Sequence, residues 1–497
     1  MQLWQNLPLF MIVLPLMCAV ISSILPGKSA RGVMCGVAGF ACLSMMTLLF
    51  FILQRGNSYI FVMGEVGAPF GNELRIGLVE CIIGLLFILI IVFSILGGWR
   101  GLTKNVAKNR IHLYSTMVCL LISSVMAITF TNDLFTAYVF IEITTIAACA
   151  LICVTNKGRT LFGATRYMIM NLLGSGMFLL GLSILYCITG HLLFPQIEES
   201  VKLLLAEGNY RIPLALAAVL MTMGIACKAA LYPFHTWLPN AYANATPTSS
   251  ALLSSVVSKL YIFLLIKIFF RAAGTDIFAQ GVGDILFVFS VVGIILGSVD
   301  AIREHHLSRM IAYSSVSQIG YIFIGISLGT EAGMAAALFH ILAHSSAKAM
   351  LFLSANKLRE VSGNSDAFRD IRASGLRAPL AGLAFAIGAC SLVGIPLLGG
   401  FTSKVFLAQA GIQAGSWRMV VMLLALAVST ALNVIYLLRT TLTLYRPGEK
   451  YPLTRSSLVK DKTFTVSMIF MIAMNIFLGV SGGAVMDLIY KGIAMFN

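Results

Sequence analysis

Five lysines and one glutamate lie well inside apolar stretches of the sequence, where charged side chains are rare. The glutamate is Glu142, in the segment VFIEITTIAACA, and the lysines are Lys228, Lys259, Lys267, Lys348 and Lys404. A cation at the centre of a bilayer costs about 2.5 to 3.5 kcal/mol on insertion scales, so it normally faces a polar interior or pairs with another group. Because both residue types can gain and lose protons, they predict proton transfer.

Glu142 lies about nine residues, or ~13 Å of helix, into its apolar stretch. An isolated anion at that depth would take up a proton, so we expect Glu142 to pair with a buried lysine. The alternative is a static ion pair that only fixes helix packing, although such pairs stabilise less than apolar packing. Lys259 is about 18 Å from either end of its stretch and must face protein or water. Lys267, one turn before Arg271, is expected to extend to the membrane interface.

His340, His344 and Lys348 are spaced by four residues, so they occupy one face of a helix. Histidine titrates near neutral pH in its ordinary state, and a stripe of three ionisable groups favours a proton relay over a structural role. Two histidines at this spacing could also bind zinc, but no nearby acidic residue or cysteine on this face completes a site. We therefore expect no metal here.

Two apolar stretches are interrupted beside a lysine. In GIACKAALYPFHTWLPNAY, Pro233 follows Lys228, and in the stretch around GIPLLGGFTSK, Gly394 and Pro396 precede Lys404. Proline breaks a helix, and the freed carbonyls are tolerated at membrane depth only if they are buried in protein or face water. Both interruptions therefore predict broken helices beside hydrated cavities.

His235 and Asp300 are weaker candidates for the same polar path. The alternative for the first break is a helix that simply ends, with His235, Trp237 and Pro239 in an interfacial belt. Asp300 either caps loop amides or extends the path. Glu80 is expected at the membrane interface.

The composition places these residues in a membrane protein. Of 497 residues, 59% are hydrophobic and 11% are charged, which excludes an ordinary soluble enzyme. The predicted fold is all-α and polytopic, with about fourteen transmembrane helices of which the seventh and twelfth are broken. The spans are expected at roughly 8–26, 32–54, 77–98, 113–130, 133–155, 163–188, 213–232, 247–271, 282–301, 307–327, 331–356, 378–411, 417–445 and 463–490.

The net charge of +15 does not form one patch, as a nucleic-acid-binding protein would require. Lysine and arginine concentrate in alternate loops, around Arg100, Arg110, Lys357, Arg372 and from Arg439 to Lys462, which predicts that these loops are cytoplasmic and that both termini face outside. The ten cysteines form no CxxC pair, and neither a phosphate loop nor a Rossmann or haem motif occurs. We expect no cofactor and no redox centre.

The two broken helices, five spans apart, fit inverted repeats of the kind found in transporters. This predicts N-terminal helices over 1–112, a first five-helix half-channel over 113–271, a second inverted five-helix repeat over 282–445, and a C-terminal loop and helix over 446–497. A gapless alignment of the segments that begin at 164 and 337 is a weak trace of the same repeat.

FIEITT, CKAALYPFHTWLPNAYANATPTSSALLSSVVSKLY, HILAHSSAKAMLF and GIPLLGGFTSK together resemble the antiporter-like subunits of the complex I superfamily. That superfamily includes the D-type subunits of Mrp sodium/proton antiporters and the ion-pumping subunits of membrane-bound hydrogenases and NADH-quinone oxidoreductases. The resemblance covers roughly spans four to twelve and favours the Mrp or hydrogenase-associated type. Asn240 departs from it, because the family commonly has Asp or an equivalent polar residue after WLP.

The resemblance implies that ions move along a central axis of charged residues. Glu142 matches the family's fifth-helix glutamate and Lys228 the seventh-helix lysine that pairs with it, while Lys259 matches the connecting lysine of the eighth helix. His340 and His344 fall in the region of the connecting histidine, next to Lys348. Lys404 matches the terminal lysine of the twelfth helix.

The function expected is therefore proton or sodium/proton translocation by one subunit of a complex in the cell inner membrane. Expected partners are other hydrophobic antiporter-like and small membrane subunits, the lipid bilayer, and an iron-sulfur, hydrogenase or NADH-oxidising module. Whether the whole assembly is an enzyme stays open, as do the transported ion and the driving reaction. The alternatives are a stand-alone transporter of an organic solute, which needs one pocket rather than an axis, and a structural subunit, which leaves the buried lysines unexplained.

Overall fold

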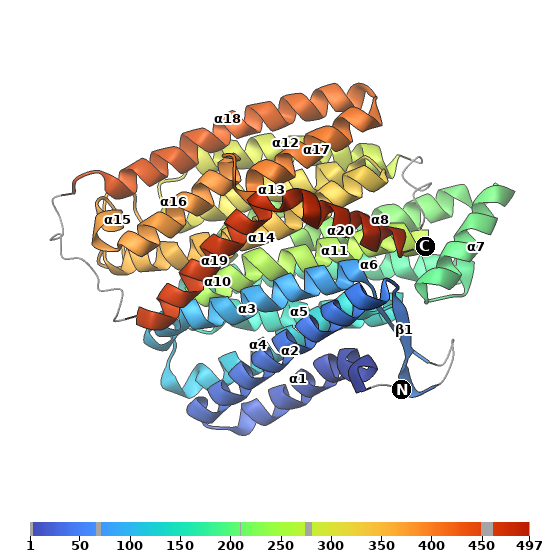
Figure 1. Cartoon of the computed structure of the whole chain (residues 1–497), viewed down its shortest axis with the longest axis horizontal. Helices are drawn as coiled ribbons and strands as arrows, with labels where there is room; N and C mark the ends of the chain where they lie inside the picture. The colour runs from blue at the N-terminus through green and yellow to red at the C-terminus, as the bar shows by residue number, and fades with distance from the viewer. Residues whose placement is uncertain (1–2, 66–70, 209, 274–280, 449–460, 497) are drawn as a thin grey trace.

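The computed structural model describes residues 3–65, 71–208, 210–273, 281–448 and 461–496. Long helices run side by side in one bundle, with the start of α1 and the end of α20 at the same end of it (Figure 1). Thirteen helices of the described chain are long and apolar enough to cross a membrane. The predicted all-α polytopic membrane fold is therefore confirmed.

The helices follow the chain in three groups. The first group comprises η1 (Leu3–Asn6), α1 (Leu7–Ile24), α2 (Gly27–Arg55), η2 (Met63–Glu65), α3 (Leu78–Asn105) and η3 (Lys108–Arg110). The second comprises α4 (Ile111–Phe130), α5 (Leu134–Cys153), α6 (Gly158–Thr189), α7 (Phe194–Glu207), α8 (Arg211–Ala229), η4 (Phe234–Trp237), α9 (Leu238–Asn244), α10 (Pro247–Leu252), η5 (Leu253–Val257), α11 (Ser258–Ile268) and η6 (Phe269–Ala273). The third comprises α12 (Val282–Arg303), α13 (Leu307–Ser327), α14 (Glu331–Glu360), α15 (Ser374–Arg377), α16 (Pro379–Val393), α17 (Gly399–Ala414), α18 (Trp417–Tyr445), α19 (Lys462–Val480) and α20 (Gly482–Ala494).

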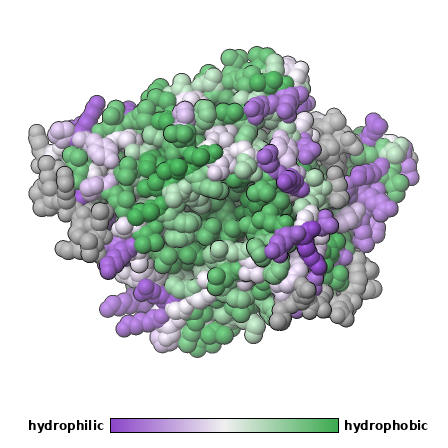
Figure 2. Space-filling view, viewed as in Figure 1, coloured by the Kyte–Doolittle hydropathy of each residue, from purple (hydrophilic) through white to green (hydrophobic). Residues whose placement is uncertain are grey.

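The helices differ in how deeply they are buried. The segment from α10 to α11 and the helix α14 lie in the centre of the bundle, whereas α1, α6 and α18 expose apolar side chains on its outside. Apolar residues cover the middle of the face shown in Figure 2, and hydrophilic residues gather towards its two ends. This distribution fits a protein whose middle contacts lipid and whose ends contact water.

Three features depart from the expected spans. Residues Tyr59–Val62 (β1) and Glu73–Ile76 (β2) form an antiparallel hairpin, in which Tyr59 is opposite Ile76. The helix α7 occupies a segment that hydropathy assigns to a loop, because it is short and carries charges on one face. The last predicted span is divided at Ser481, between α19 and α20.

Both predicted helix breaks are present. The helix α8 ends at Ala229, and Ala230 takes a left-handed conformation with φ of 62° before the chain continues through Pro233 into η4 and α9. The helix α16 ends at Val393, where Gly394 has φ of 92°, and the chain passes Pro396 before α17 begins. An interfacial belt after the first break is wrong, because His235 and Trp237 are buried and helix follows them.

Two charged residues near the ends of the bundle are fully buried. Glu80 lies in the first turn of α3, and its Oε1 atom accepts a bond of 2.6 Å from Arg75 on β2. Lys267 does not extend to the membrane surface: it is fully buried, and its Nζ atom donates to the backbone carbonyls of Ile128, Thr129 and Thr131. The carbonyls left free at the end of α4 give this lysine closer acceptors than water.

Candidate functional site

Glu142 on α5 and Lys228 on α8 form an ion pair inside the bundle. The Nζ atom of Lys228 lies 3.3 Å from Oε1 of Glu142. The lysine side chain is completely buried, whereas 28% of the glutamate side chain is exposed on the outside of this single chain. The buried partner that the sequence predicts for Glu142 is therefore Lys228.

Hydroxyl groups surround this ion pair. Ser175 on α6 donates to the same Glu142 oxygen, and Lys228 donates to Oγ1 of Thr145 at 3.0 Å. Thr145 in turn lies 3.3 Å from the hydroxyl of Tyr261, two residues after Lys259 on α11. These contacts connect the ion pair by polar groups to the helix that carries the next buried lysine.

Lys259 is fully buried and follows a short π-helical segment, η5. Its Nζ atom donates to the carbonyl of Ser254 within that segment. Among the described residues it has no carboxylate within ion-pair distance. It lies close enough to His340, His344 and Lys348 to interact with them electrostatically. Single π turns occur often at functional sites, and this one changes the direction of side chains just before Lys259.

The two histidines of α14 lie next to one another, with ring centroids 5.8 Å apart. Nδ1 of His340 is 3.0 Å from Oγ of Ser403 on α17, which carries Lys404 in the next position. Neither ring nitrogen of His344 has a hydrogen-bond partner in the described part of the chain. The histidines therefore occupy the space between Lys259 and the second helix break, and His344 has free capacity to accept or donate a proton.

Lys348 is the member of the α14 stripe that turns away from the histidines. Its Nζ atom donates to the carbonyl of Ile311 at 2.7 Å and to the hydroxyl of Ser314 at 2.5 Å, both on α13. Spacing by four residues correctly places all three side chains on one helix. It does not predict that the long side chain of Lys348 bonds to a carbonyl and a hydroxyl oxygen on the neighbouring helix.

Lys404 lies against the break between α16 and α17. Its Nζ atom donates to the carbonyl of Val393 at 2.8 Å and to Oγ1 of Thr430 on α18 at 3.1 Å. The carbonyl is free because α16 ends there. Gly394 makes room for the lysine: a Cβ atom at that position would lie 3.2 Å from Cδ of Lys404.

His235 and Asp300 come together beside the first break. Nε2 of His235 lies 4.0 Å from Oδ2 of Asp300 on α12, and the imidazole stacks on the ring of Tyr232 with centroids 4.8 Å apart. The pair joins η4, which follows α8, to the last turn of α12. It is separate from the contacts of Lys228.

Several polar partners were not identified from the sequence. Ser175, Thr145, Tyr261, Ser403 and Thr430 each contact one of the predicted residues, and serine or threonine inside an apolar helix is too common to single out. A sharper indication was available for Tyr261 and Ser403, which lie two positions after Lys259 and one position before Lys404.

Comparison with known proteins now decides the family. A family model described as NADH:quinone oxidoreductase/Mrp antiporter, transmembrane, matches residues 131–432. The chain belongs to this family. It is an antiporter-like subunit of the complex I superfamily, as the sequence motifs predict. The matched region contains all seven residues of the predicted translocation site.

Relatives of this NADH:quinone oxidoreductase/Mrp antiporter family member match it over nearly its full length. The NADH-quinone oxidoreductase subunit N of Desulforudis audaxviator is 30% identical, over 91% of this chain and 89% of its own. A Staphylococcus aureus protein named as antiporter subunit mnhD2 is 27% identical, over 95% of this chain and 93% of its own.

Solved structures share the fold of this family member. A chain of the membrane-bound sulfane sulfur reductase, an archaeal respiratory membrane complex, is 24% identical with a TM-score of 0.87, covering 99% of this chain and 98% of its own. A chain of the Mrp complex from Dietzia is 22% identical with a TM-score of 0.83, covering 99% and 97%. A chain of respiratory complex I from Thermus thermophilus is 21% identical with a TM-score of 0.72, covering 96% and 100%.

Proposed function

We propose that this antiporter-like subunit moves protons along a buried line of residues within a larger membrane complex. The line runs from Glu142 and Lys228 through Lys259, His344 and His340 to Lys404. The observation that supports it is the ion pair of Glu142 and Lys228 at 3.3 Å inside the bundle, which polar contacts join to the helix that carries Lys259. Ionisable groups at bilayer depth are costly to bury, so their presence there is typical of a site that moves charge.

The ion pair would act as the switch. Glu142 accepts hydrogen bonds from both Lys228 and Ser175, so it has a neutral partner when the lysine is released. Separating two unit charges from 4 Å at an effective dielectric constant of ~20 removes about 4 kcal/mol of Coulomb energy. That change corresponds to about a thousandfold in proton binding, since each 1.36 kcal/mol is tenfold. Opening the pair would therefore drive the Lys228 proton towards Lys259.

The two broken helices would divide the path into two halves. In this proposal residues 113–271 form the half-channel that contains Lys228, and residues 282–445 form the inverted repeat that contains Lys404. Residues 1–112 and 446–497 surround them. Lys348 and the pair of His235 and Asp300 would be side branches, because their bonds lead to α13 and α12 rather than along the line.

Exposure of Glu142 supports membrane partners. A carboxylate with 28% of its side chain exposed at bilayer depth would face lipid if the chain were alone. We infer that a neighbouring hydrophobic subunit covers it, in a complex of the Mrp or respiratory type.

The driving module would be an iron-sulfur, hydrogenase or NADH-oxidising module, or an ion gradient alone. We also place the protein in the cell inner membrane with both termini outside, from the charge of its loops.

A solute carrier is the competing function. It requires one substrate pocket near the middle of the membrane. Three cavities in the described part of the chain lie around loops and helix ends, lined by residues such as Arg439, Asn240 and Thr155. A line of ionisable residues that extends through both halves of the bundle suits an ion path better than a single solute site.

The test is transport by the complex purified through a tag on this chain and reconstituted in vesicles. Glu142→Gln and Lys228→Ala should each lower proton transport at least about tenfold. The matched controls are Glu198→Gln and Lys202→Ala, which remove an exposed ion pair of 2.6 Å on α7. Full activity of both site variants would refute the mechanism. Measurement with and without sodium separates proton from sodium/proton transport, and mass spectrometry of the purified complex identifies the partners.

A further inference from the structure

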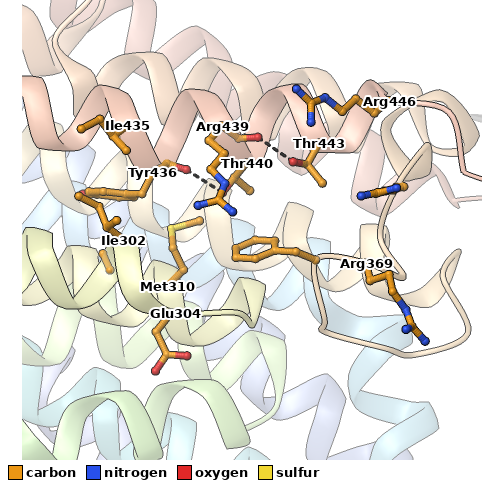
Figure 3. Close-up of a pocket in the computed structure, with 13 residues that line it drawn as sticks. Ile302, Glu304, Met310, Arg369, Ile435, Tyr436, Arg439, Thr440, Thr443 and Arg446 are labelled. Carbon is orange, nitrogen blue, oxygen red and sulfur yellow. Dashed lines mark hydrogen bonds between the residues drawn. The ribbon is translucent and has the colours of Figure 1, made fainter.

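A cavity of about 320 Å³ lies at one end of the second half of the bundle, away from the proposed proton path. It is bounded by the last turns of α18, by Ile302 and Glu304 at the end of α12, and by the segment from Phe368 to Arg372 (Figure 3). The surrounding loops belong to the side that the charge pattern predicts as cytoplasmic.

Four arginines line this cavity: Arg369, Arg372, Arg439 and Arg446. Figure 3 shows Arg439 pointing from α18 into the space above Met310, with Arg446 about two turns further along, where α18 ends. Among the described residues that line the cavity the one carboxylate is Glu304, and its Oε1 atom already accepts a bond of 3.0 Å from Arg309. In the described part of the chain, none of the four guanidinium groups has a carboxylate within ion-pair distance. Four positive charges beside a single carboxylate leave an excess of positive charge, which favours a bound anion.

The cavity also has an apolar side. Ile302, Met310 and Ile435 line it together with the arginines. Beyond it, α18 exposes Val434 and Leu442 on the outside of the bundle. A ligand with a charged head and an apolar tail could place its head among the arginines and its tail along this helix.

We propose that this cavity binds the phosphate group of an anionic phospholipid. Arginine is suited to this ligand, because its planar fork of donors bonds two phosphate oxygens at once. Basic pockets between transmembrane helices on the cytoplasmic side bind anionic headgroups by the same chemistry. The bound phosphate would join Arg439 on α18 to Arg369 and Arg372, and so hold the segment between α14 and α15 against the bundle. This site is independent of the proposed proton path.

The experiment measures lipid binding to the purified full-length chain by native mass spectrometry. The probes are phosphatidylglycerol, phosphatidylcholine and inorganic phosphate. The variants are the double substitution Arg439→Gln with Arg446→Gln, and the single substitution Arg439→Lys. The control is Lys108→Gln with Arg303→Gln, which removes the same charge from exposed residues of the same side that do not line the cavity.

We expect phosphatidylglycerol to be retained at least fivefold more than phosphatidylcholine. The double glutamine variant should lose that preference, Arg439→Lys should keep part of it, and the control should keep all of it. Thermal unfolding of each variant without lipid shows whether it is folded. Equal retention by the cavity variant and the control would overturn the proposal. Displacement of phosphatidylglycerol by millimolar inorganic phosphate, with no preference between the two lipids, would overturn the lipid as the source of the phosphate.

Discussion

Lys228 and Lys404 both lie beside a broken helix, but they are held by different kinds of partner. Lys228 contacts the carboxylate of Glu142 as well as Thr145, whereas Lys404 contacts the Val393 carbonyl and the Thr430 hydroxyl. The first lysine therefore belongs to a neutral pair. In the described part of the chain the second, when protonated, is stabilised by a carbonyl, a hydroxyl and the ring of Tyr321, whose centroid is 5.3 Å from its Nζ atom. The difference suggests that the first break contains the switch and that the second responds to charge arriving along the line.

The backbone of the two breaks differs as well. Ala230 adopts a left-handed conformation at the first break, whereas at the second break a Cβ atom on Gly394 would lie 3.2 Å from Cδ of Lys404. Lys228 is therefore positioned mainly by its ion pair, whereas Lys404 is positioned by packing against Gly394.

The largest expected effect is on transport, where both lysines should be needed. Lys228→Met and Lys404→Met remove a proton carrier, and proton transfer by a positioned side chain contributes ~10²–10⁴-fold to a rate. We expect each to lower proton transport by the reconstituted complex about 100-fold. Lys202→Met, which changes an exposed lysine, should leave the rate unchanged. Transport by Lys404→Met at the normal rate would limit the path to the first half of the molecule.

Substitution of the two lysines should have different effects on the free energy of unfolding, although both are expected to be needed for transport. Lys228→Met leaves Glu142 without its ion partner, and breaking a buried pair costs about 3 kcal/mol or more of the free energy of unfolding. Adding Glu142→Gln to Lys228→Met should recover most of that loss, since the two substitutions are coupled. Lys404→Met leaves the Val393 carbonyl without its donor but no carboxylate without its cation, so it should cost less, about 1–3 kcal/mol. Denaturant unfolding of the detergent-purified chain measures all of these, and equal costs for the two lysines would contradict the comparison.

The asymmetry between the two lysines could be predicted only in part from the sequence. Depth in an apolar stretch was sufficient to predict that Glu142 needs a lysine, and Pro233 and Pro396 were sufficient to locate both breaks. These predictions succeed because burying a charge or breaking a helix is costly wherever the chain folds. The partners of Lys404 and Lys348 are backbone carbonyls and hydroxyl groups on other helices. Burying these neutral groups has no comparable cost, so the sequence does not indicate which of them each lysine contacts.

The errors have the same origin. Lys267 is close to a helix end in the sequence, but the free carbonyls of α4, which it contacts, are more than 130 residues away along the chain. The hairpin of β1 and β2 has only four residues in each strand, too few for a periodic pattern. Contacts between distant segments are therefore the part of the site that needed the structure.

A smaller effect is expected at the backbone of the breaks. Gly394→Ala places a Cβ atom 3.2 Å from Cδ of Lys404 and forces alanine to a φ of 92°. A residue held in a sparsely populated conformation costs about 1–3 kcal/mol, and the lysine must also shift. We expect lower stability and several-fold slower transport.

Ala230→Gly is the matched change at the first break. It relieves a left-handed alanine but makes the unfolded chain more flexible, so its stability should stay within about 1 kcal/mol of the parent. Transport should be unchanged, because the Glu142 to Lys228 pair positions the first lysine. A larger loss of transport in Ala230→Gly than in Gly394→Ala would show that packing, rather than the ion pair, places Lys228.

The smallest expected effect comes from the two threonines that contact the lysines. Thr145→Val and Thr430→Val each remove a hydroxyl acceptor, at 3.0 Å from Lys228 and 3.1 Å from Lys404. Hydrogen bonds to charged groups are worth about 1.5–3 kcal/mol, but Lys228 keeps its carboxylate while Lys404 keeps only one carbonyl. Proton transport should therefore fall several-fold in Thr430→Val and less than twofold in Thr145→Val. Because the substitutions are chemically identical, a greater loss in Thr145→Val would mean that the hydroxyl carries the proton from Lys228 towards Tyr261, and that the ion pair alone does not determine the first step.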